Sequence, residues 1–178
     1  MGKLYDALSE RHKKWIAKQK MFFVATAPVG AEGHVNLSPK GLNTFKVLDD
    51  HTVAYLDLSG SGLETIAHIK QNQRITIMMT AFEGPPLTLR LFGKGEVMRY
   101  GTPEYEALQS HFIQHTGARS IIKVNVTRIQ DSCGYSIPLY EYKGDRKVYD
   151  NYCEQKGREA IEASFKERTE SIDGIKAN

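Results

Sequence analysis

The sequence is poor in cysteine and has no long apolar segment. Its two cysteines, Cys133 and Cys153, are isolated and form no C-x-x-C pair. Isolated cysteines are typical of a reducing compartment, so we predict a cytoplasmic protein. The sequence has no run of about 18 apolar residues and no apolar signal-peptide core near its first residue. We therefore expect no membrane-spanning helix and no membrane partner.

An excess of charge of one sign is also absent. Lysine and arginine number 24 against 21 aspartates and glutamates, which gives a formal net charge of +3. The basic residues are scattered among acidic ones, which argues against a nucleic-acid-binding surface. The small excess of positive charge suits a small anionic ligand. We find no Ser-His-Asp arrangement and no P-loop. Gly93-Lys94-Gly95 lacks the third glycine of a dinucleotide fingerprint.

Short apolar runs separated by turn residues are what the sequence does contain. Apolar spacing predicts helices at 4–16, 61–69, 102–115 and 148–169. Strands are predicted at 21–26, 34–38, 45–48, 52–56, 74–80, 87–100 and 121–129. Strands joined by such short connections indicate a mainly β (α+β) fold. We expect a closed or partly open antiparallel barrel rather than a parallel sheet.

Two polar motifs, each following an apolar run, are the most informative part of the sequence. Ser38-Pro39-Lys40-Gly41 combines a hydroxyl and a cation with a glycine that allows close backbone approach. Residues 57–65 place a Gly/Ser turn and an S-x-x-E capping box, Ser61 to Glu64, before a helix whose first N–H groups favour an anion. Each motif alone fits an ordinary turn or cap. The two together, one short strand apart, indicate a cradle for a phosphate-bearing ligand.

Three further patterns have two interpretations each. Thr88 and Arg90 share one face of a predicted strand, which fits both a ligand contact and a solvated surface. His111 and His115 lie four apart on a predicted helix, a metal-ligand spacing, but no third ligand is evident, so we predict no metal. Cys133 precedes a glycine and has no base near it in the sequence. A turn cysteine is therefore the better interpretation than a reactive thiol.

Several segments together resemble the pyridoxamine 5′-phosphate oxidase-like, FMN-binding split-barrel family, and most closely its pyridoxamine 5′-phosphate oxidase-related branch. The resemblance covers about residues 15–142 and is carried by segments 22–26, 36–41, 55–68, 82–86, 89–93 and 131–135. It implies a six-stranded antiparallel split barrel and a homodimer with FMN at its interface. We accordingly expect a split-barrel flavin-binding domain with an N-terminal helix at 1–142 and a C-terminal helical extension at 143–178.

The resemblance also implies which residues bind the cofactor. The strand that ends at Lys40 would touch the FMN phosphate and ribityl chain. Thr65 would approach the phosphate from the helix start, and Thr88 or Arg90 would meet the flavin. The full set of expected cofactor-binding residues is Asn36, Ser38, Lys40, Leu58, Ser59, Ser61, Thr65, Thr88 and Arg90. We assign no catalytic residue, because the flavin itself carries the redox chemistry.

The sequence departs from the family pattern in two places. Oxidases of the family have an Arg-Lys pair at the helix start, whereas this chain has Glu64-Thr65, which predicts weaker FMN binding. They also end with a tryptophan and an Arg-x-His segment that hold the substrate phosphate, and neither follows Cys133 here. We therefore expect a flavin-dependent oxidoreductase that does not oxidise pyridoxamine phosphate.

Three alternatives stay open at this point. The first is a flavin carrier or sensor without turnover. The second places haem or a deazaflavin in the same cleft, with His68 or His111 as the iron ligand. The third is a protein whose dimer surface is its function, because Glu64 has weakened the phosphate site.

Overall fold

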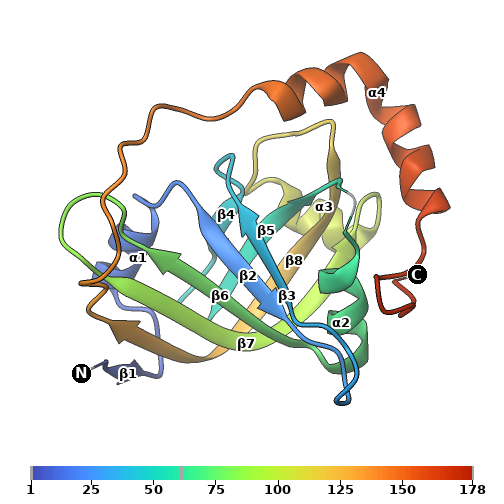
Figure 1. The fold of residues 1–178 in the computed structure, drawn as a ribbon. Helices are drawn as coiled ribbons and strands as arrows, with labels where there is room; N and C mark the ends of the chain where they lie inside the picture. The colour runs from blue at the N-terminus through green and yellow to red at the C-terminus, as the bar shows by residue number, and fades with distance from the viewer. Residues whose placement is uncertain (1, 61, 178) are drawn as a thin grey trace.

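The chain folds around one curled sheet with helices at its ends (Figure 1). The computed structural model describes residues 2–60 and 62–177. The strands are β1 (Leu4–Tyr5), β2 (Phe22–Thr26), β3 (Asn36–Lys40), β4 (Phe45–Val47), β5 (Thr52–Leu58), β6 (Arg74–Thr80), β7 (Thr88–Arg99) and β8 (Ala118–Ser132). The helices are α1 (Glu10–Ile16), α2 (Glu64–Asn72), α3 (Pro103–Gln109) and α4 (Val148–Glu167).

The sheet is antiparallel, with strand order β3-β2-β6-β7-β8-β5-β4, and β1 pairs with β8. Its two edge strands, β3 and β4, do not pair with each other, so the curled sheet stays open along one side. The predicted mainly β split barrel is therefore confirmed. The strand number differs from six, because two short strands, β1 and β4, extend the sheet at β8 and β5.

Two hairpins form, since β2 pairs with β3 and β4 pairs with β5. Strand β7 is irregular at one point, because its register with β8 shifts between Phe92 and Gly93. A Cβ on Gly93 would collide with the backbone carbonyl oxygen of Asn125 on the neighbouring strand. Only glycine allows the two strands to approach this closely at that point.

Three predicted helix boundaries were wrong. The first helix begins at Glu10, after the N-cap Ser9, because the residues before it pair with β8 as β1. Helix α3 ends at Gln109, and the chain then turns so that Phe112 packs into a small apolar cluster under the helix. Helix α2 begins at Glu64. Its N-cap is Leu63, which is buried in the core and makes no side-chain capping bond.

The main core lies inside the curl of the sheet, where apolar residues of β2, β5, β6, β7 and β8 meet the buried face of α2. Burial of this apolar surface is the principal stabilising contribution to the fold. No helix in the described part of the chain is long and apolar enough to cross a membrane.

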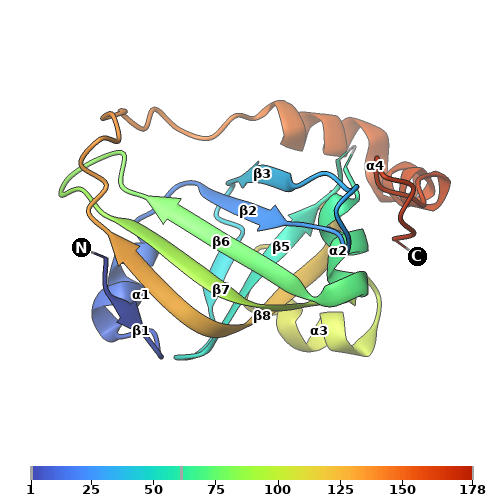
Figure 2. The same ribbon diagram turned by 60° about the horizontal axis from the view of Figure 1, so that its bottom comes forward.

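After β8 the chain runs back across the molecule before it forms α4. Figures 1 and 2 show this connector and α4 passing over the side of the barrel that carries β3, with the C-terminus near α2. Helix α4 is interrupted at Gly157, whose φ of 73° lies in the left-handed region. Residues near both ends of this segment are buried, including Cys153 and Ala177. The division of the chain at residue 142 stays a prediction.

Candidate functional site

A chain of polar side chains links β3 to the first turn of α2. The side-chain nitrogen of Asn36 donates hydrogen bonds to the hydroxyls of Thr26 and Thr65, each over 3.0 Å. Ser38 in turn donates to the Asn36 side-chain oxygen over 3.0 Å. The Thr26 hydroxyl lies 3.0 Å from Nδ1 of the buried His68. Three of the predicted cofactor-binding residues, Asn36, Ser38 and Thr65, are thus brought together where β3 lies beside the first turn of α2.

Beside this chain, two buried side chains on β5 keep hydrogen-bonding capacity that the described protein does not use. The hydroxyl of Tyr55 and Oδ1 of Asp57 are buried and have no protein hydrogen-bond partner. The Tyr55 hydroxyl lies next to Thr65 and Asp57; burial, together with the negative charge of Asp57, raises its pKa well above the ordinary value. Unpaired buried polar groups are costly, so two of them facing the start of a helix mark a site for a polar ligand.

The same carboxylate holds two cations in place. Oδ2 of Asp57 accepts hydrogen bonds from Arg119 Nε (2.8 Å) and from the Ser120 hydroxyl (3.1 Å). The Lys40 ammonium lies 3.8 Å from Oδ1. Since Asp57 is 1% exposed, the pairing takes place largely out of water, where the attraction between charges is strong.

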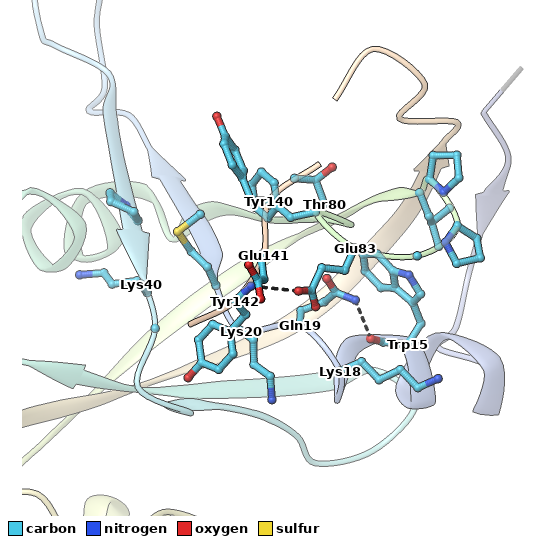
Figure 3. Close-up of a pocket in the computed structure, with 18 of the residues that line it drawn as sticks. Trp15, Lys18, Gln19, Lys20, Lys40, Thr80, Glu83, Tyr140, Glu141 and Tyr142 are labelled. Atoms are coloured by element: carbon cyan, nitrogen blue, oxygen red, sulfur yellow. Dashed lines mark hydrogen bonds between the residues drawn. The ribbon is translucent and has the colours of Figure 1, made fainter. Parts of the chain in front are cut away.

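Lys40 also lines a large cleft at the opposite end of β3. The cleft has a volume of about 1180 Å³ and lies between α1, the end of β3, the β6–β7 loop and the connector after β8 (Figure 3). Its lining is rich in aromatic residues and proline and carries more basic than acidic side chains. The lining includes Trp15, Phe82, Pro85, Pro86, Tyr140 and Tyr142, the basic residues Arg11, Lys14, Lys18, Lys20, Lys40 and Arg146, and the acidic residues Glu83, Glu141 and Asp145. A cleft of this size and lining suits a planar aromatic ligand with negative charge.

The connector is held against the cleft by its backbone. The amide of Tyr142 donates to a carboxylate oxygen of Glu83 (2.9 Å), and the amide of Tyr140 donates to the carbonyl oxygen of Phe82 (2.9 Å). The rings of Phe82 and Tyr140 pack with their centroids 5.4 Å apart. Lys20 lies over the ring of Tyr142, 5.4 Å from its centroid. These contacts make the connector one wall of the cleft.

Strand β3 runs from the chain of polar side chains at the start of α2 to the aromatic cleft. Asn36 and Lys40 are four residues apart on an extended strand, so their Cα atoms are separated by roughly 13 Å. Ser38 lies between them on the same face, since side chains alternate along a strand. A ligand with an anionic group at one end of a flexible chain and an aromatic ring at the other would match this arrangement.

The predicted loop residues take part in other contacts. Leu58 ends β5 and packs against the small apolar cluster near α3. The Ser59 hydroxyl lies 2.7 Å from the hydroxyl of Tyr149 on α4. Ser61, and with it the predicted capping box, lies outside the described residues. The structure brings this loop next to α4 and not into the cleft.

The two predicted residues on β7 lie apart from the polar chain on β3. Thr88 is buried, and its hydroxyl lies 2.9 Å from that of Thr80 on β6. Arg90 donates to the Ser132 hydroxyl on β8 over 3.2 Å. Thr88 and the adjacent Leu89 are 5% and 1% exposed, so both faces of the strand are covered at this point. Of this group only Thr80, which was not predicted, lines the cleft.

The histidines proposed as iron ligands do not line the cleft. His68 is fully buried beneath Thr26, and burial lowers its pKa. His111 is exposed and follows the end of α3, so it does not share a helix face with His115. His115 lies 2.8 Å from Asp150 of α4. No group of three or more metal-ligating side chains occurs in the residues that the structure describes.

Sequence reasoning missed several residues of the site. Asp57 carries a local signal, because it is an acid inside the otherwise apolar strand β5. Arg119 and Thr26 carry none, since each reaches the site only through strand pairing. Trp15 and Tyr142 line the cleft from opposite ends of the sequence, so their proximity also had no local signal.

Comparison with known proteins gives a consistent relationship. The sequence model of the pyridoxamine 5′-phosphate oxidase family matches residues 8–133. A protein of Aspergillus flavus named pyridoxamine 5′-phosphate oxidase family protein ustO is 38% identical over 145 residues, which is 79% of this chain and 58% of that protein. The chain therefore spans little more than half the length of this relative.

Solved structures show the same fold. A HupZ variant from Group A Streptococcus is 25% identical, with a TM-score of 0.55, and the match covers 70% of this chain and 98% of that one. A structure from Lactobacillus delbrueckii, described as a candidate pyridoxamine 5′-phosphate oxidase, is 13% identical with a TM-score of 0.53 over 70% of this chain and 94% of that one. At that identity the second likeness concerns the fold alone.

Proposed function

The chain belongs to the pyridoxamine 5′-phosphate oxidase family, and on this premise we propose that it binds FMN and uses it in a redox reaction on a substrate other than pyridoxamine phosphate. One observation carries the proposal. A single strand, β3, connects a polar cluster at the start of α2 with an aromatic cleft of about 1180 Å³. FMN has a phosphate at one end of a ribityl chain and a planar ring at the other, so its two ends would meet the two regions.

The residues present fit such a ligand. The Thr65 hydroxyl and the first N–H groups of α2 would bind the phosphate, and the unpaired Tyr55 hydroxyl would donate a hydrogen bond beside them. Asn36, whose two N–H groups are donated to Thr26 and Thr65, would hold the Thr65 hydroxyl in place. Ser38 would contact the ribityl hydroxyls. The ring would occupy the cleft, where Trp15 and Phe82 exclude water. When bound, FMN supplies hydride or electron transfer.

Lys40 would place a positive charge at the edge of the ligand site. Its ammonium lies 3.8 Å from Asp57 and points away from the labelled cleft residues in Figure 3, so its position does not depend on the ligand. A fixed cation favours negative charge on a neighbouring group, and in a water-poor cleft the effect is larger than in solution. This residue would therefore tune the redox behaviour of the bound cofactor.

We also propose a homodimer formed through the β3 side of the barrel. Strand β3 is an edge strand, and the apolar residues Val35 and Leu37 on this side are 74% and 64% exposed. An unpaired edge with exposed apolar side chains is a surface that a second copy can cover. The same side carries Asn36 and Ser38, so a partner there would lie next to the cofactor.

An absorbance spectrum and a titration with FMN test the proposal. We expect the wild-type protein to bind FMN with a dissociation constant in the micromolar range or below. Asn36→Ala should weaken binding about tenfold, because it removes the side chain that holds the Thr65 hydroxyl in place at the phosphate end. A spectrum with a haem band, or no binding of FMN, would contradict the proposal. Oxidation of NADPH or NADH by the loaded protein would separate an oxidoreductase from a carrier or sensor.

A further inference from the structure

The C-terminal segment from α4 to residue 177 covers the loop that precedes α2. Figures 1 and 2 both place its end beside α2. The Tyr149 hydroxyl lies 2.7 Å from that of Ser59, and Arg168 donates from Nη1 to the carbonyl oxygen of Gly60 over 3.1 Å. Segment 148–177 therefore lies directly against the part of the chain where the phosphate of a ligand is expected.

Both ends of this segment are anchored to the barrel. At the start of α4, Asp150 lies 2.8 Å from Nε2 of His115. Near the C-terminus, Asp173 accepts hydrogen bonds from the backbone and ring nitrogens of His34, at 2.9 Å and 2.7 Å, and these bonds lower its pKa. Ile161 of α4 is 2% exposed and Ala177 is 1% exposed. The segment thus has a defined position, and its side chains have fixed places over the loop.

The charges around the start of α2 make one cation prominent. Glu64 is the only charged side chain in the first turn of α2. Its Oε1 accepts a hydrogen bond from the backbone amide of Ile172 (3.2 Å). Glu64 is thus directed toward the C-terminal segment as part of its attachment. Arg119 also reaches the loop, at the carbonyl oxygen of Gly62, but it is paired with Asp57, a carboxylate that it shares with Lys40.

Arg168 is the remaining cation at this loop among the described contacts. Its side chain approaches from the C-terminal segment, and one of its N–H groups binds Gly60. A guanidinium has five donors in a planar array, so further donors are left for a phosphate oxygen. Bidentate binding of this kind is why arginine is favoured at phosphate sites.

We propose that segment 148–177 completes the phosphate end of the cofactor site within the same chain, and that Arg168 binds the phosphate. The inference rests on the proposed FMN function and adds a residue and a selectivity to it. Arg168 makes the site specific for a phosphorylated flavin over riboflavin, which has the same ring and ribityl chain but no phosphate. Glu64 contributes by holding the segment in place.

Titrations of the full chain with FMN and with riboflavin test this proposal. Arg168→Gln should weaken FMN binding about tenfold or more and change riboflavin binding less than twofold, because only FMN carries the charge that Arg168 meets. Arg168→Lys should recover part of the FMN affinity. The control is Lys166→Ala, an exposed cation two residues earlier on α4, which should leave both affinities unchanged.

The outcomes separate the two proposals. If the wild-type protein binds FMN but Arg168→Gln binds it equally well, the role of Arg168 is overturned and the FMN proposal stands. Equal losses for FMN and riboflavin would show a structural effect and overturn the role as well. A wild-type protein that binds neither flavin overturns both proposals. Thermal unfolding of each variant checks that the fold is retained.

Discussion

The Lys40 ammonium lies 3.8 Å from Oδ1 of Asp57, although the two residues belong to opposite ends of the sheet order, on β3 and β5. The contact crosses the interior of the curled sheet near its open side. Asp57 is thereby shared between Lys40, which lines the cleft, and Arg119, which reaches the loop before α2. One buried carboxylate connects the two ends of the candidate site.

Replacing this carboxylate should destabilise the protein strongly. Asp57→Asn leaves the charge of Arg119, whose side chain is 9% exposed, without its partner. Removing one member of a buried ion pair costs about 3–5 kcal/mol. We expect the free energy of unfolding to fall by about 3 kcal/mol. Urea unfolding followed by circular dichroism measures it. The control is Asp50→Asn, in an exposed pair with Lys13, for which we expect less than about 1 kcal/mol.

The buried His68 should make stability depend on pH. Burial is the largest influence on its ring and lowers its pKa, with partial opposition from Asp173 and Glu64. In the unfolded chain a histidine takes up its proton near pH 6.5. Below that pH the unfolded state binds more protons than the folded state, so the free energy of unfolding falls as the pH falls.

Urea unfolding at pH 7.5 and pH 5.5 measures this effect. His68→Gln should reduce the difference between the two values, even if the variant is less stable at both. His12, whose pKa is also lowered by burial, accounts for some remaining dependence. An unchanged difference in His68→Gln would show that other groups cause the whole pH dependence.

A charge on the exposed side of β3 should prevent dimerisation. Leu37 is 64% exposed on this edge strand, so Leu37→Glu has little effect on the isolated barrel. In a dimer through this side, the same change would bury an unpaired carboxylate, which is strongly unfavourable. Light scattering should show a dimer for the wild type and a monomer for the variant. Ile113→Glu, an equally exposed position after α3, is the control and should stay dimeric.

Position 93, where the register of β7 shifts, should not tolerate a side chain. In Gly93→Ala the new Cβ would meet the backbone carbonyl oxygen of Asn125, which cannot move without disturbing β8. Overpacking of this kind typically costs about 1–3 kcal/mol, and we expect a lower Tm and earlier unfolding in urea. Gly60→Ala, where the added Cβ has no neighbour within 4 Å, should leave stability almost unchanged. Similar Tm values for the two variants would refute this explanation of Gly93.

Much of the fold was predictable because its signals are local. The alternation of apolar residues along Arg74–Thr80 predicted β6 with its observed bounds, and Thr102-Pro103 predicted where α3 begins. Helix ends were less predictable. Helix α2 begins at Glu64, and its N-cap is the buried Leu63, whose place in the core is a tertiary contact.

The candidate site was predictable only where one strand carries it. Asn36, Ser38 and Lys40 stand at alternate positions of β3, but the strand was predicted at 34–38, so the sequence placed only Asn36 and Ser38 on one strand face. The structure determined which groups they meet. Thr65, Asp57 and the cleft residues come from elements distant in the sequence, and strand pairing and helix packing bring them to β3.

The sequence by itself determined most of the element types and the antiparallel barrel, because periodicity and turn residues act over a few neighbours, and its motifs determined the family resemblance. Only the tertiary structure decided that Asp57 lies between Lys40 and Arg119, and that Arg168 reaches the loop before α2 from 108 residues away. Such contacts depend on the curl of the sheet and on the path of the C-terminal segment. Both are set by the burial of apolar residues from the whole chain, which no local pattern encodes.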